Sequence, residues 1–278
     1  MLTKTLATYK FIIVSILMRK IMYKPLQIPF ILNPEFFNSV LYTEEAIDSL
    51  SDFVICFWEM LPKKQDKTTV ENIIITDACI DIVVGFDDKQ IGFAGMTKTD
   101  FHHTQNISSS FFGVRMKPGV FQLLAEISAS KLMDTYLPLN QIYHNFDLEY
   151  FFNLPYIQAK EVFKDFLFTI FKNKKADTYT KLFDELNDSF PLSPADVYEK
   201  LHFSPRQCQR LFAKHYGISI QLAISILRFQ KCLNALVNEH LSPTEVLAIT
   251  NYYDQSHFIK DFKRNIGITP FELLRKYK

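Results

Sequence analysis

Between about residues 53 and 117 the chain alternates short apolar runs with turn residues. The runs are FVICFWEML, VENIIIT, CIDIVVGF and FFGVRMK, and Asp87-Asp88 follows the third of them. Short runs rich in Ile, Val and Phe that are bounded by turn residues are typical of β-strands. This pattern predicts a β-rich domain in the first half of the chain.

From about residue 120 the apolar period becomes helical. One stripe follows positions i, i+3, i+4 and i+7 from Val120 to Ile127, and another lies within residues 156–172. The polar patch at 173–177 is the best candidate for a boundary, and the pattern after it is helical. We therefore expect an α+β protein in three parts: an N-terminal extension at 1–21, a β-rich sensor domain with trailing helices at 22–173, and an all-helical domain at 178–278.

Two segments of the helical part resemble each other at an offset of 50 residues. FSPRQCQRLFAKHYGIS begins at Phe203, and YDQSHFIKDFKRNIGIT begins at Tyr253. A shorter helix precedes each copy, so each unit has the pattern helix, turn, helix. We expect the units at about 193–217 and 242–267, joined by one long helix from Ile220 to about Asn238. Such a helix spans about 28 Å, close to the roughly 34 Å between successive major-groove faces of a duplex.

Four Ser/Thr-Pro steps mark the expected helix starts in this part of the chain. An acceptor follows each hydroxyl three residues later, which gives the pairs Ser193 and Asp196, Ser204 and Gln207, Ser242 and Glu245, and Thr269 and Glu272. A hydroxyl N-cap, proline at the first helical position and an acceptor at the third satisfy unpaired N–H groups, at about 1 kcal/mol for each cap. Gly217 and Gly267 stand where a helix end favours the left-handed conformation.

The second helix of each unit has an apolar face and a basic face. In unit one the apolar stripe contains Cys208, Leu211, Phe212 and Tyr216, and the opposite face carries Arg206, Gln209, Arg210 and Lys214. In unit two the stripe is Phe258, Phe262 and Ile266, and Ser256, Ile259, Lys260, Lys263 and Arg264 point outward. A helix-turn-helix places its second helix in the major groove, where Arg and Gln bond to base edges. Two tandem units with matched caps favour DNA binding over an ordinary solvated face.

The stretch from about 181 to 278 resembles the DNA-binding domain of the AraC/XylS family of bacterial transcription regulators. The match is strongest in YYDQSHFIKDFKRNIGITP, from Tyr252 to Pro270, and FSPRQCQRLF in unit one also fits. The resemblance implies seven helices and base-reading roles for Arg206, Gln209, Arg210, Gln255, Ser256 and Lys260. We expect phosphate contacts from Ser204, Gln207, Lys214, His257, Lys263 and Arg264. Two positions depart from the pattern: Asn251 stands where relatives carry glycine, and Ile259 either contacts a thymine methyl group or packs inward.

The N-terminal half resembles, less closely, a sensor domain found on one branch of this family. The matching pieces are DSLSDFVICFW, DACIDIVVGF and FFGVRMKPG. The resemblance implies a β-barrel-like, cupin-related module and does not imply a ligand. Arg115, inside the last piece, either faces solvent or anchors an anionic effector. We expect His102, His103 and His144 to be surface loop histidines, because no further ligand stands at a metal-binding spacing.

Charge and composition narrow the function classes. Residues 181–278 hold 13 basic and 10 acidic residues, a net of +3, and the remainder holds 18 against 20, a net of −2. This asymmetry has the sign expected if the helical part meets DNA. The seven glycines form no phosphate-binding loop. The apolar run FIIVSILM near the N-terminus is far shorter than the roughly 20 residues that cross a bilayer.

The sequence therefore predicts a cytoplasmic, sequence-specific transcription regulator with double-stranded DNA as its partner and no membrane partner. A small-molecule effector, a homodimer and, for an activator, RNA polymerase are further partners that this organisation admits. The alternative is an enzyme or DNA-repair protein targeted to DNA, which needs a metal-bound nucleophilic cysteine; the four cysteines are scattered, without a Cys-x-x-Cys pair. A helical protein-interaction module is a third reading. We expect no catalytic residue, metal ligand or cofactor.

Overall fold

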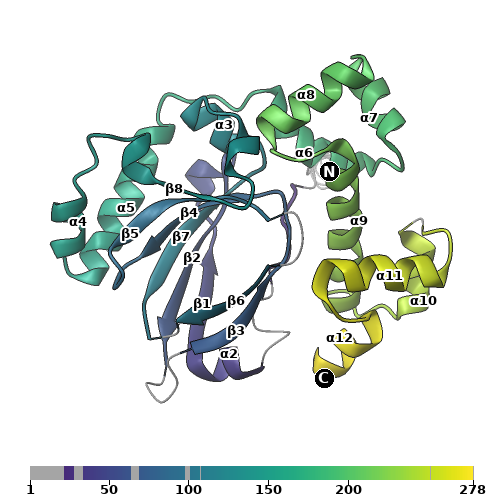
Figure 1. Cartoon of the computed structure of the whole chain (residues 1–278), viewed down its shortest axis with the longest axis horizontal. Coiled ribbons are helices and arrows are strands. Elements are labelled where there is room, and N and C mark those ends of the chain that lie inside the picture. Colours follow the sequence, from purple (N-terminus) through teal and green to yellow (C-terminus); the bar gives the residue numbers. More distant parts are fainter. Residues whose placement is uncertain are drawn as a thin grey trace, which may run out of the picture.

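The computed structural model describes residues 22–27, 34–63, 69–97, 101–106, 108–250 and 252–277. A β-rich N-terminal part is followed by an all-helical C-terminal part (Figure 1). The predicted α+β fold class is therefore confirmed. The N-terminal extension at 1–21 and the turn residue Asn251 lie outside the described residues.

The N-terminal part contains a six-stranded sheet and a separate two-stranded sheet, and every pairing is antiparallel. The strands of the larger sheet are, in spatial order, β1 (Val40–Glu45), β2 (Val54–Pro62), β7 (Phe111–Met116), β4 (Ile80–Gly85), β5 (Gln90–Ala94) and β8 (Tyr136–Pro138). The smaller sheet pairs β3 (Thr69–Ile74) with β6 (Phe101–Asn106). The four predicted runs are β2, β3, β4 and β7, so those predictions are confirmed. The cupin-like character of this domain stays a prediction.

The two faces of the larger sheet differ in chemistry because successive side chains of a strand point to opposite sides. Ile82 and Phe112 lie on the face covered by α5 (Tyr156–Phe171), and the ring of Phe112 is 5.6 Å from that of Phe163. The opposite face carries Trp58, Asp81, Val83 and Arg115, from β2, β4 and β7. One face therefore builds the core, while the other is partly polar.

Short helices connect the strands and close the N-terminal part. They are α2 (Pro34–Ser39), η1 (Asp48–Leu50), α3 (Val120–Ala125), η2 (Ala129–Leu132), η3 (Leu139–Gln141) and α4 (Leu148–Asn153). The stripe within 156–172 corresponds to α5, and the stripe from Val120 corresponds to α3, which ends at Ala125 so that Ile127 lies beyond the helix.

Seven helices follow in the described residues after 177, the number that the family resemblance implies. They are α6 (Thr178–Ser189), α7 (Pro194–Leu201), α8 (Pro205–His215), α9 (Ile220–Val237), α10 (Pro243–Ile249), α11 (Gln255–Ile266) and α12 (Pro270–Tyr277). Unit one is α7–α8, unit two is α10–α11, and α9 stands between them (Figure 1). In the described part of the chain, α9 alone is long and apolar enough to cross a membrane, but most of it is buried in the protein core.

The apolar residues form two large cores rather than one for each half of the chain. The first core runs without a break from the six-stranded sheet through α5 and α6 to unit one and the first half of α9. The second contains the rest of α9 together with unit two and α12. The predicted boundary at 173–177 falls between α5 and α6, yet the first core crosses it, so this boundary stays a prediction.

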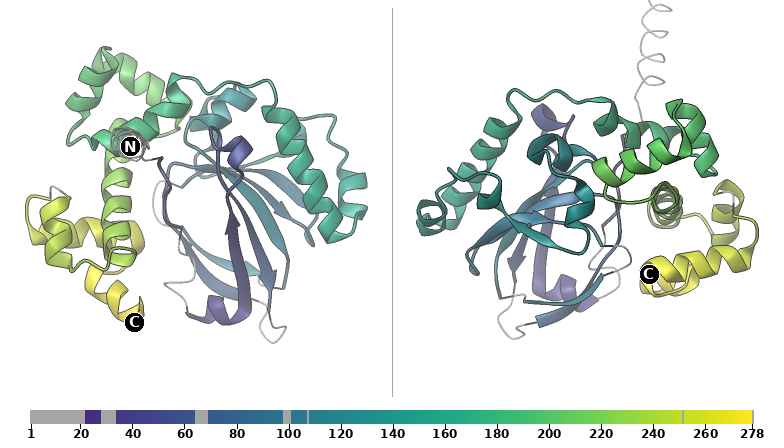
Figure 2. Two further views of the ribbon diagram at one scale, coloured as in Figure 1. Left: turned by 180° about the vertical axis from the view of Figure 1, so that it is seen from behind. Right: turned by 45° about the horizontal axis from the view of Figure 1, so that its top comes forward.

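Residues 22–27 bind the two halves of the protein together, and we call this segment the strap. The backbone N–H of Tyr23 donates to Asp184 of α6 at 2.7 Å. Farther along the strap, Leu26 donates its N–H to the side chain of Gln230 in α9 at 2.8 Å, and Gln230 donates back to the Leu26 carbonyl. Seen from behind, the strap runs between α9 and the sheet (Figure 2).

Candidate nucleic-acid interface

The four predicted helix starts are all formed as N-caps. The side chain of Asp196 accepts from the backbone of Ser193 at 3.0 Å, and that of Glu272 accepts from Thr269 at 2.7 Å. Ser204 and Ser242 make the same exchange with Gln207 and Glu245. These bonds lower the pKa of Asp196, Glu245 and Glu272, because they stabilise the charged carboxylates. These four caps fix the starts of α7, α8, α10 and α12, whereas the second reading helix, α11, is capped by Asp254, which accepts from the His257 N–H at 2.7 Å.

In unit one, α8 divides into the two faces that the sequence predicted. Cys208, Phe212 and Tyr216 are buried, with exposures of 0%, 0% and 1%. The predicted DNA-facing side chains are all exposed: Arg206, Gln209, Arg210 and Lys214. The face that remains open to a partner carries three cations and no carboxylate.

In unit two, α11 shows the same division with one difference. Phe258, Phe262 and Ile266 are fully buried. The predicted readers and phosphate contacts are exposed: Gln255, Ser256, His257, Lys260, Lys263 and Arg264. Ile259, which was expected to point outward, is half-buried and packs against the second core. Of its two interpretations, inward packing is the one the structure supports.

Three of the predicted phosphate contacts also have structural roles. The hydroxyl of Ser204 and the side-chain oxygen of Gln207 bond to each other at 2.8 Å within the N-cap, so only the amide NH₂ of Gln207 remains to donate to a ligand. Arg264 donates to Asp261 in its own helix and to Ser225 of α9 at 3.4 Å. Arg264 therefore braces α11 against α9 while 67% of its side chain stays exposed.

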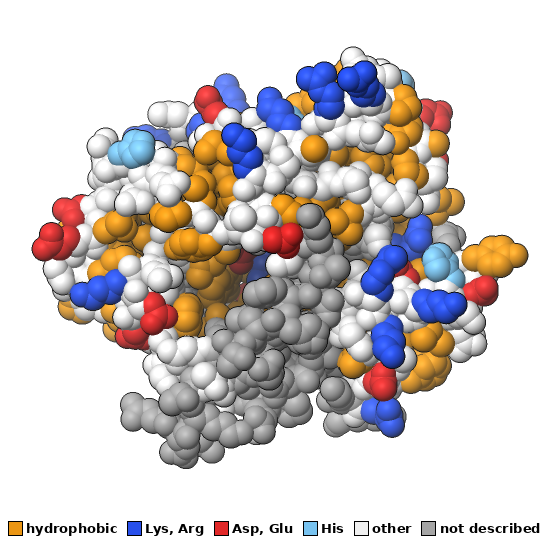
Figure 3. All heavy atoms as spheres, viewed as in Figure 1, with side chains coloured by type: hydrophobic (Ala, Val, Ile, Leu, Met, Phe, Trp, Pro, Cys, Tyr) orange, Lys and Arg blue, Asp and Glu red, His pale blue; other side chains and the backbone are white. Residues whose placement is uncertain are grey.

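The spacing of the two units agrees with two neighbouring grooves. The 18 residues of α9 span about 27 Å at 1.5 Å for each residue. In the space-filling view, Lys and Arg side chains gather over α8 at the top and over α11 and α12 at the right, on the same face of the molecule (Figure 3). Basic side chains over both units therefore lie on one side of the molecule.

Arg115 lies in the wall of a cavity on the polar face of the six-stranded sheet. Only 7% of its side chain is exposed, so it does not face solvent. Its guanidinium lies 3.1 Å from Glu44 and 3.7 Å from both Asp77 and Asp81. Three carboxylates already neutralise this cation, which argues against the predicted role of anchoring an anionic effector. Whether Arg115 binds an effector of another kind stays a prediction.

The expected loop position of two histidines was wrong. His102 and His103 lie in strand β6, where their residues pair with Ile73 and Asn72 of β3. Their surroundings in sequence lack apolar alternation, which is why the strand was missed. His144 lies in an exposed turn, as expected. Among the described residues no group of three His, Cys, Asp or Glu side chains gathers in a way that could hold a metal ion.

The cysteines have the environment of inert core residues. All four are buried: Cys56, Cys79, Cys208 and Cys232. Burial raises the pKa of Cys56 and of Cys232 to about 12. Since the thiolate is the nucleophile, these surroundings oppose the DNA-repair alternative, which needs a reactive cysteine.

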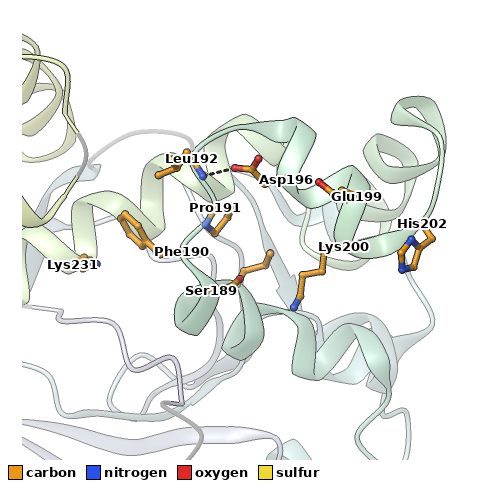
Figure 4. Close-up of a pocket in the computed structure, with 10 residues that line it drawn as sticks. Ser189, Phe190, Pro191, Leu192, Asp196, Glu199, Lys200, His202 and Lys231 are labelled. Carbon is orange, nitrogen blue, oxygen red and sulfur yellow. Dashed lines mark hydrogen bonds between the residues drawn. The ribbon is translucent and has the colours of Figure 1, made fainter.

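A second hollow, of about 790 Å³, lies at the junction of α6 and α7 (Figure 4). Its charged side chains already have partners. Asp196 accepts from the Leu192 N–H at 2.8 Å, Lys231 lies 4.0 Å from the centre of the Phe190 ring, and Lys200 is 3.6 Å from Glu185. Of its charged side chains only Glu199 has no described partner, and it lies at an exposed position, so this hollow offers no buried charge that would select a ligand.

The sequence did not reveal the contacts that join the two halves of the protein. Lys117, just after β7, forms a buried ion pair with Asp184 of α6 at 3.1 Å. Tyr23 donates its hydroxyl to the carbonyl of Asp77, which also lines the cavity at Arg115. A buried Lys-Asp pair between residues 67 positions apart leaves no signal in a single sequence, because each residue alone is typical of a protein surface.

Two family models match the chain, one in each half. Residues 197–276 match a model described as "Helix-turn-helix domain", and residues 45–138 match "Domain of unknown function (DUF6597)". The chain is 26% identical over 114 residues to the "Uncharacterized HTH-type transcriptional regulator YpdC" of Escherichia coli (strain K12). That match covers 41% of this chain and 37% of YpdC, so it spans little more than a third of the relative.

Solved structures were also compared with the chain. The C-terminal domain of AraT, a response regulator from Geobacillus stearothermophilus, is 25% identical with a TM-score of 0.32, covering 34% of this chain and 79% of that one. ToxT from Vibrio cholerae is 13% identical with a TM-score of 0.41, covering 86% of this chain and 98% of that one.

Proposed function

We propose that the chain is a sequence-specific DNA-binding transcription regulator of the AraC/XylS type, and the match of residues 197–276 to a helix-turn-helix family model supports this proposal. The two reading helices, α8 and α11, enter adjacent major-groove segments of one duplex. The N-terminal domain regulates this binding. Such a protein works in the cytoplasm as a regulator rather than an enzyme.

One observation carries the proposal: two capped helices with exposed basic faces lie at opposite ends of a single buried helix. Arg206, Gln209 and Arg210 supply base contacts from unit one, and Gln255, Ser256 and Lys260 supply them from unit two. Lys214, His257, Lys263 and Arg264 hold the phosphates together with Ser204 and Gln207 at the N-terminus of α8. Positioning by phosphate contacts and specificity by base contacts is the usual division in protein–DNA recognition.

The contacts between the halves support regulation by the N-terminal domain. Lys117 and Asp184 join the end of β7 to α6, and the strap joins the sheet to both α6 and α9. A ligand in the N-terminal domain can shift DNA affinity only by binding one arrangement of these contacts better than another. A small-molecule effector and a homodimer are two ways to supply that difference, and RNA polymerase is a further partner if the protein is an activator.

The first test uses the full chain, because unit one shares its core with the N-terminal domain. Selection from a pool of random duplexes should recover a site with two half-elements about one helical turn apart. Affinity for this site should fall steeply between about 50 and about 200 mM salt, as release of counterions from the phosphates requires. Recovery of no consensus, or binding that salt does not weaken, would refute the proposal.

Two substitutions separate base reading from phosphate contact. Arg210→Ala should relax the preference at one base position, at about 1–3 kcal/mol for the selected base. Lys263→Ala should weaken all duplexes alike and reduce the salt dependence by about one counterion. If both variants lose affinity equally for every sequence, Arg210 is not a base-reading residue.

A further inference from the structure

The cavity at Arg115 has the size of a small-molecule site. Its volume is about 700 Å³, within the roughly 300–1,000 Å³ of ligand pockets in proteins. It lies on the side of the six-stranded sheet opposite α5. Trp58, Phe111 and Tyr136 provide apolar surface in its wall, and Ala94 and Gly95 leave the space open. The sheet thus forms a hollow with aromatic walls and one buried polar cluster.

Negative charge is in excess in this cluster. Arg115 supplies one buried positive charge, whereas Glu44, Asp77 and Asp81 place three carboxylates within 3.1 to 3.7 Å of it. The cavity wall also includes Asp88. Burying charge without compensation is costly, so this cluster carries more negative charge than its buried surroundings favour. A ligand with a positively charged group would balance this excess of negative charge.

Asp81 is the carboxylate best placed to meet a ligand. One of its oxygens accepts from the indole N–H of Trp58 at 2.9 Å, and the other has no hydrogen-bond partner among the described residues. Its side chain is 19% exposed, and it lines the cavity. Asp77 is less available, because its two oxygens accept from the Cys79 N–H and from Gln27 of the strap.

A second and independent observation shows that the cluster is incomplete. The Nε atom of Arg115 is buried and has no hydrogen-bond acceptor in the described part of the chain. Unpaired buried donors are rare, and each calls for an unseen partner. An oxygen acceptor, on a ligand or on a water molecule bound beside it, would satisfy this atom.

We propose that this cavity binds a small organic cation, an amine whose ammonium group pairs with Asp81 and whose apolar body packs on Trp58 and Tyr136. Aromatic rings favour such ligands because their faces attract cations. The inference deepens the proposed function, on which it rests, by naming the ligand class of the regulatory domain. Asp77 touches both the cavity and the strap, so occupation of the site reaches the contacts to α6 and α9.

The chain contains a convenient probe of this site. Trp58 is its single tryptophan, so tryptophan fluorescence, excited selectively over that of the 13 tyrosines, reports on the cavity. We would titrate the full chain, without DNA, with phenethylamine, choline and cadaverine, and with two near-isosteres of the first, phenethyl alcohol and hydrocinnamate. At least one amine should change the fluorescence with an affinity at least about tenfold above both isosteres, since each tenfold step corresponds to one good charge interaction.

A substitution then assigns the binding to Asp81. Asp81→Asn keeps an acceptor for the Trp58 N–H but loses the charge, so the amine affinity should fall at least about tenfold. Asp165→Asn, at an exposed position on α5, serves as the matched control and should leave the affinity unchanged. Any of three results would overturn the proposal. The alcohol or the carboxylate could bind more tightly than the amines, no amine could change the fluorescence, or Asp81→Asn could bind the amine as well as the unmodified protein does.

The dependence on pH gives a readout that a structural role of Asp81 would not produce. Burial raises the pKa of Asp81 to about 7, against the opposing effect of Arg115, with Asp77 and Glu44 as the other charges that face it. Amine affinity should therefore rise from about pH 6 to about pH 8, as Asp81 loses its proton, and Asp81→Asn should abolish this rise. The fluorescence titration tests amine binding without DNA, and DNA affinity measured with and without the amine tests the regulator proposal. The failure of one proposal can therefore be distinguished from the failure of the other.

Discussion

The two helix-turn-helix units have the same local design and different surroundings. Unit one shares an unbroken apolar core with the β-rich domain. At its end, Gly217 lies against the backbone of η2, where an added Cβ would be 2.8 Å from the Ala129 carbonyl oxygen. In unit two, Phe258 and Phe262 pack with α9 and α12; among the described residues, Ile75 and Leu26 are the N-terminal members of that second core.

This difference shows which unit the N-terminal domain can act on directly. Ser128 donates its hydroxyl to the Ala213 carbonyl of α8 at 3.3 Å and so docks unit one on the N-terminal part, while the buried Lys117–Asp184 pair fixes the preceding helix α6. Unit two is positioned through α9. A signal in the N-terminal domain would therefore reach unit two through α9, which meets the strap at Gln230, and through Ile75 and Leu26, which belong to the second core.

The largest test of this comparison removes one equivalent phenylalanine from each unit. Phe212 and Phe262 are both 0% exposed, so truncation of either to alanine should cost about 3–5 kcal/mol. We expect Phe212→Ala to lower the stability of the β-rich domain as well, and Phe262→Ala to open unit two locally. Hydrogen exchange measured by mass spectrometry checks this, since in Phe262→Ala only peptides from unit two, α12 and the second half of α9, where Phe229 packs on Phe262, should lose protection. Equal loss of protection throughout the chain in both variants would mean that unit two is not separate.

The next test uses the two equivalent glycines. Gly217 and Gly267 have φ values of 73° and 74°, so alanine at either position costs about 1–2 kcal/mol of backbone strain. Gly217→Ala should cost about 3 kcal/mol, because its Cβ must also displace the Ala129 carbonyl. Chemical denaturation of the full chain measures both. If the two variants are equally stable, η2 does not hold unit one tightly.

The sequence predicted most of what is local in this structure. Periodic apolar residues, four N-caps and paired glycines placed the helices of both units, because each signal lies within one helix or one turn. It missed β6, because apolar and polar residues do not alternate around His102 and His103. For Arg115 it left two interpretations open, exposure to solvent or binding of an anionic effector.

The contacts between distant segments could not be predicted in this way. Glu44, Asp77 and Asp81 are brought to Arg115 only by the sheet, in which β2 stands between β1 and β7 and β4 pairs with β7, so their excess of charge cannot be read from sequence spacing. The strap was assigned to the sensor domain by default, and nothing in its six residues indicates the bonds to Asp184 and Gln230. The DNA-facing residues remain predictions, because the local pattern shows exposure and charge but not which base each residue meets.

Lowering the pH should destabilise unit one more than unit two. His215 stacks on Tyr179 with ring centres 3.8 Å apart, and burial, with help from Lys214, lowers its pKa from 6.5 to about 4. Because the unfolded chain takes up a proton near pH 6.5 and the folded protein does not, stability falls as pH drops from about 6.5 toward about 4. Asn265, at the equivalent position in unit two, does not titrate.

Replacement of this histidine makes the effect measurable. When the pH is lowered from about 7 to about 5, the free energy of unfolding of the unmodified protein should fall by about 2 kcal/mol more than that of the His215→Phe variant. Urea denaturation at the two pH values gives the difference, with Asn265→Ala as the control that should keep the full dependence on pH. A variant that retains the same dependence would show that other groups cause it.

The smallest test compares the N-caps of the two reading helices. Ser204 accepts from the Gln207 N–H at 3.4 Å, and the equivalent Asp254 accepts from the His257 N–H at 2.7 Å. Alanine at either position should cost about 1 kcal/mol, but the loss should appear in different places. In Ser204→Ala it should lower the global stability, since α8 unfolds together with the first core, whereas in Asp254→Ala it should raise hydrogen exchange in α11 alone. Asp254→Asn keeps the acceptor and should restore protection; if it does not, the charge of Asp254 rather than its hydrogen bond stabilises the second reading helix.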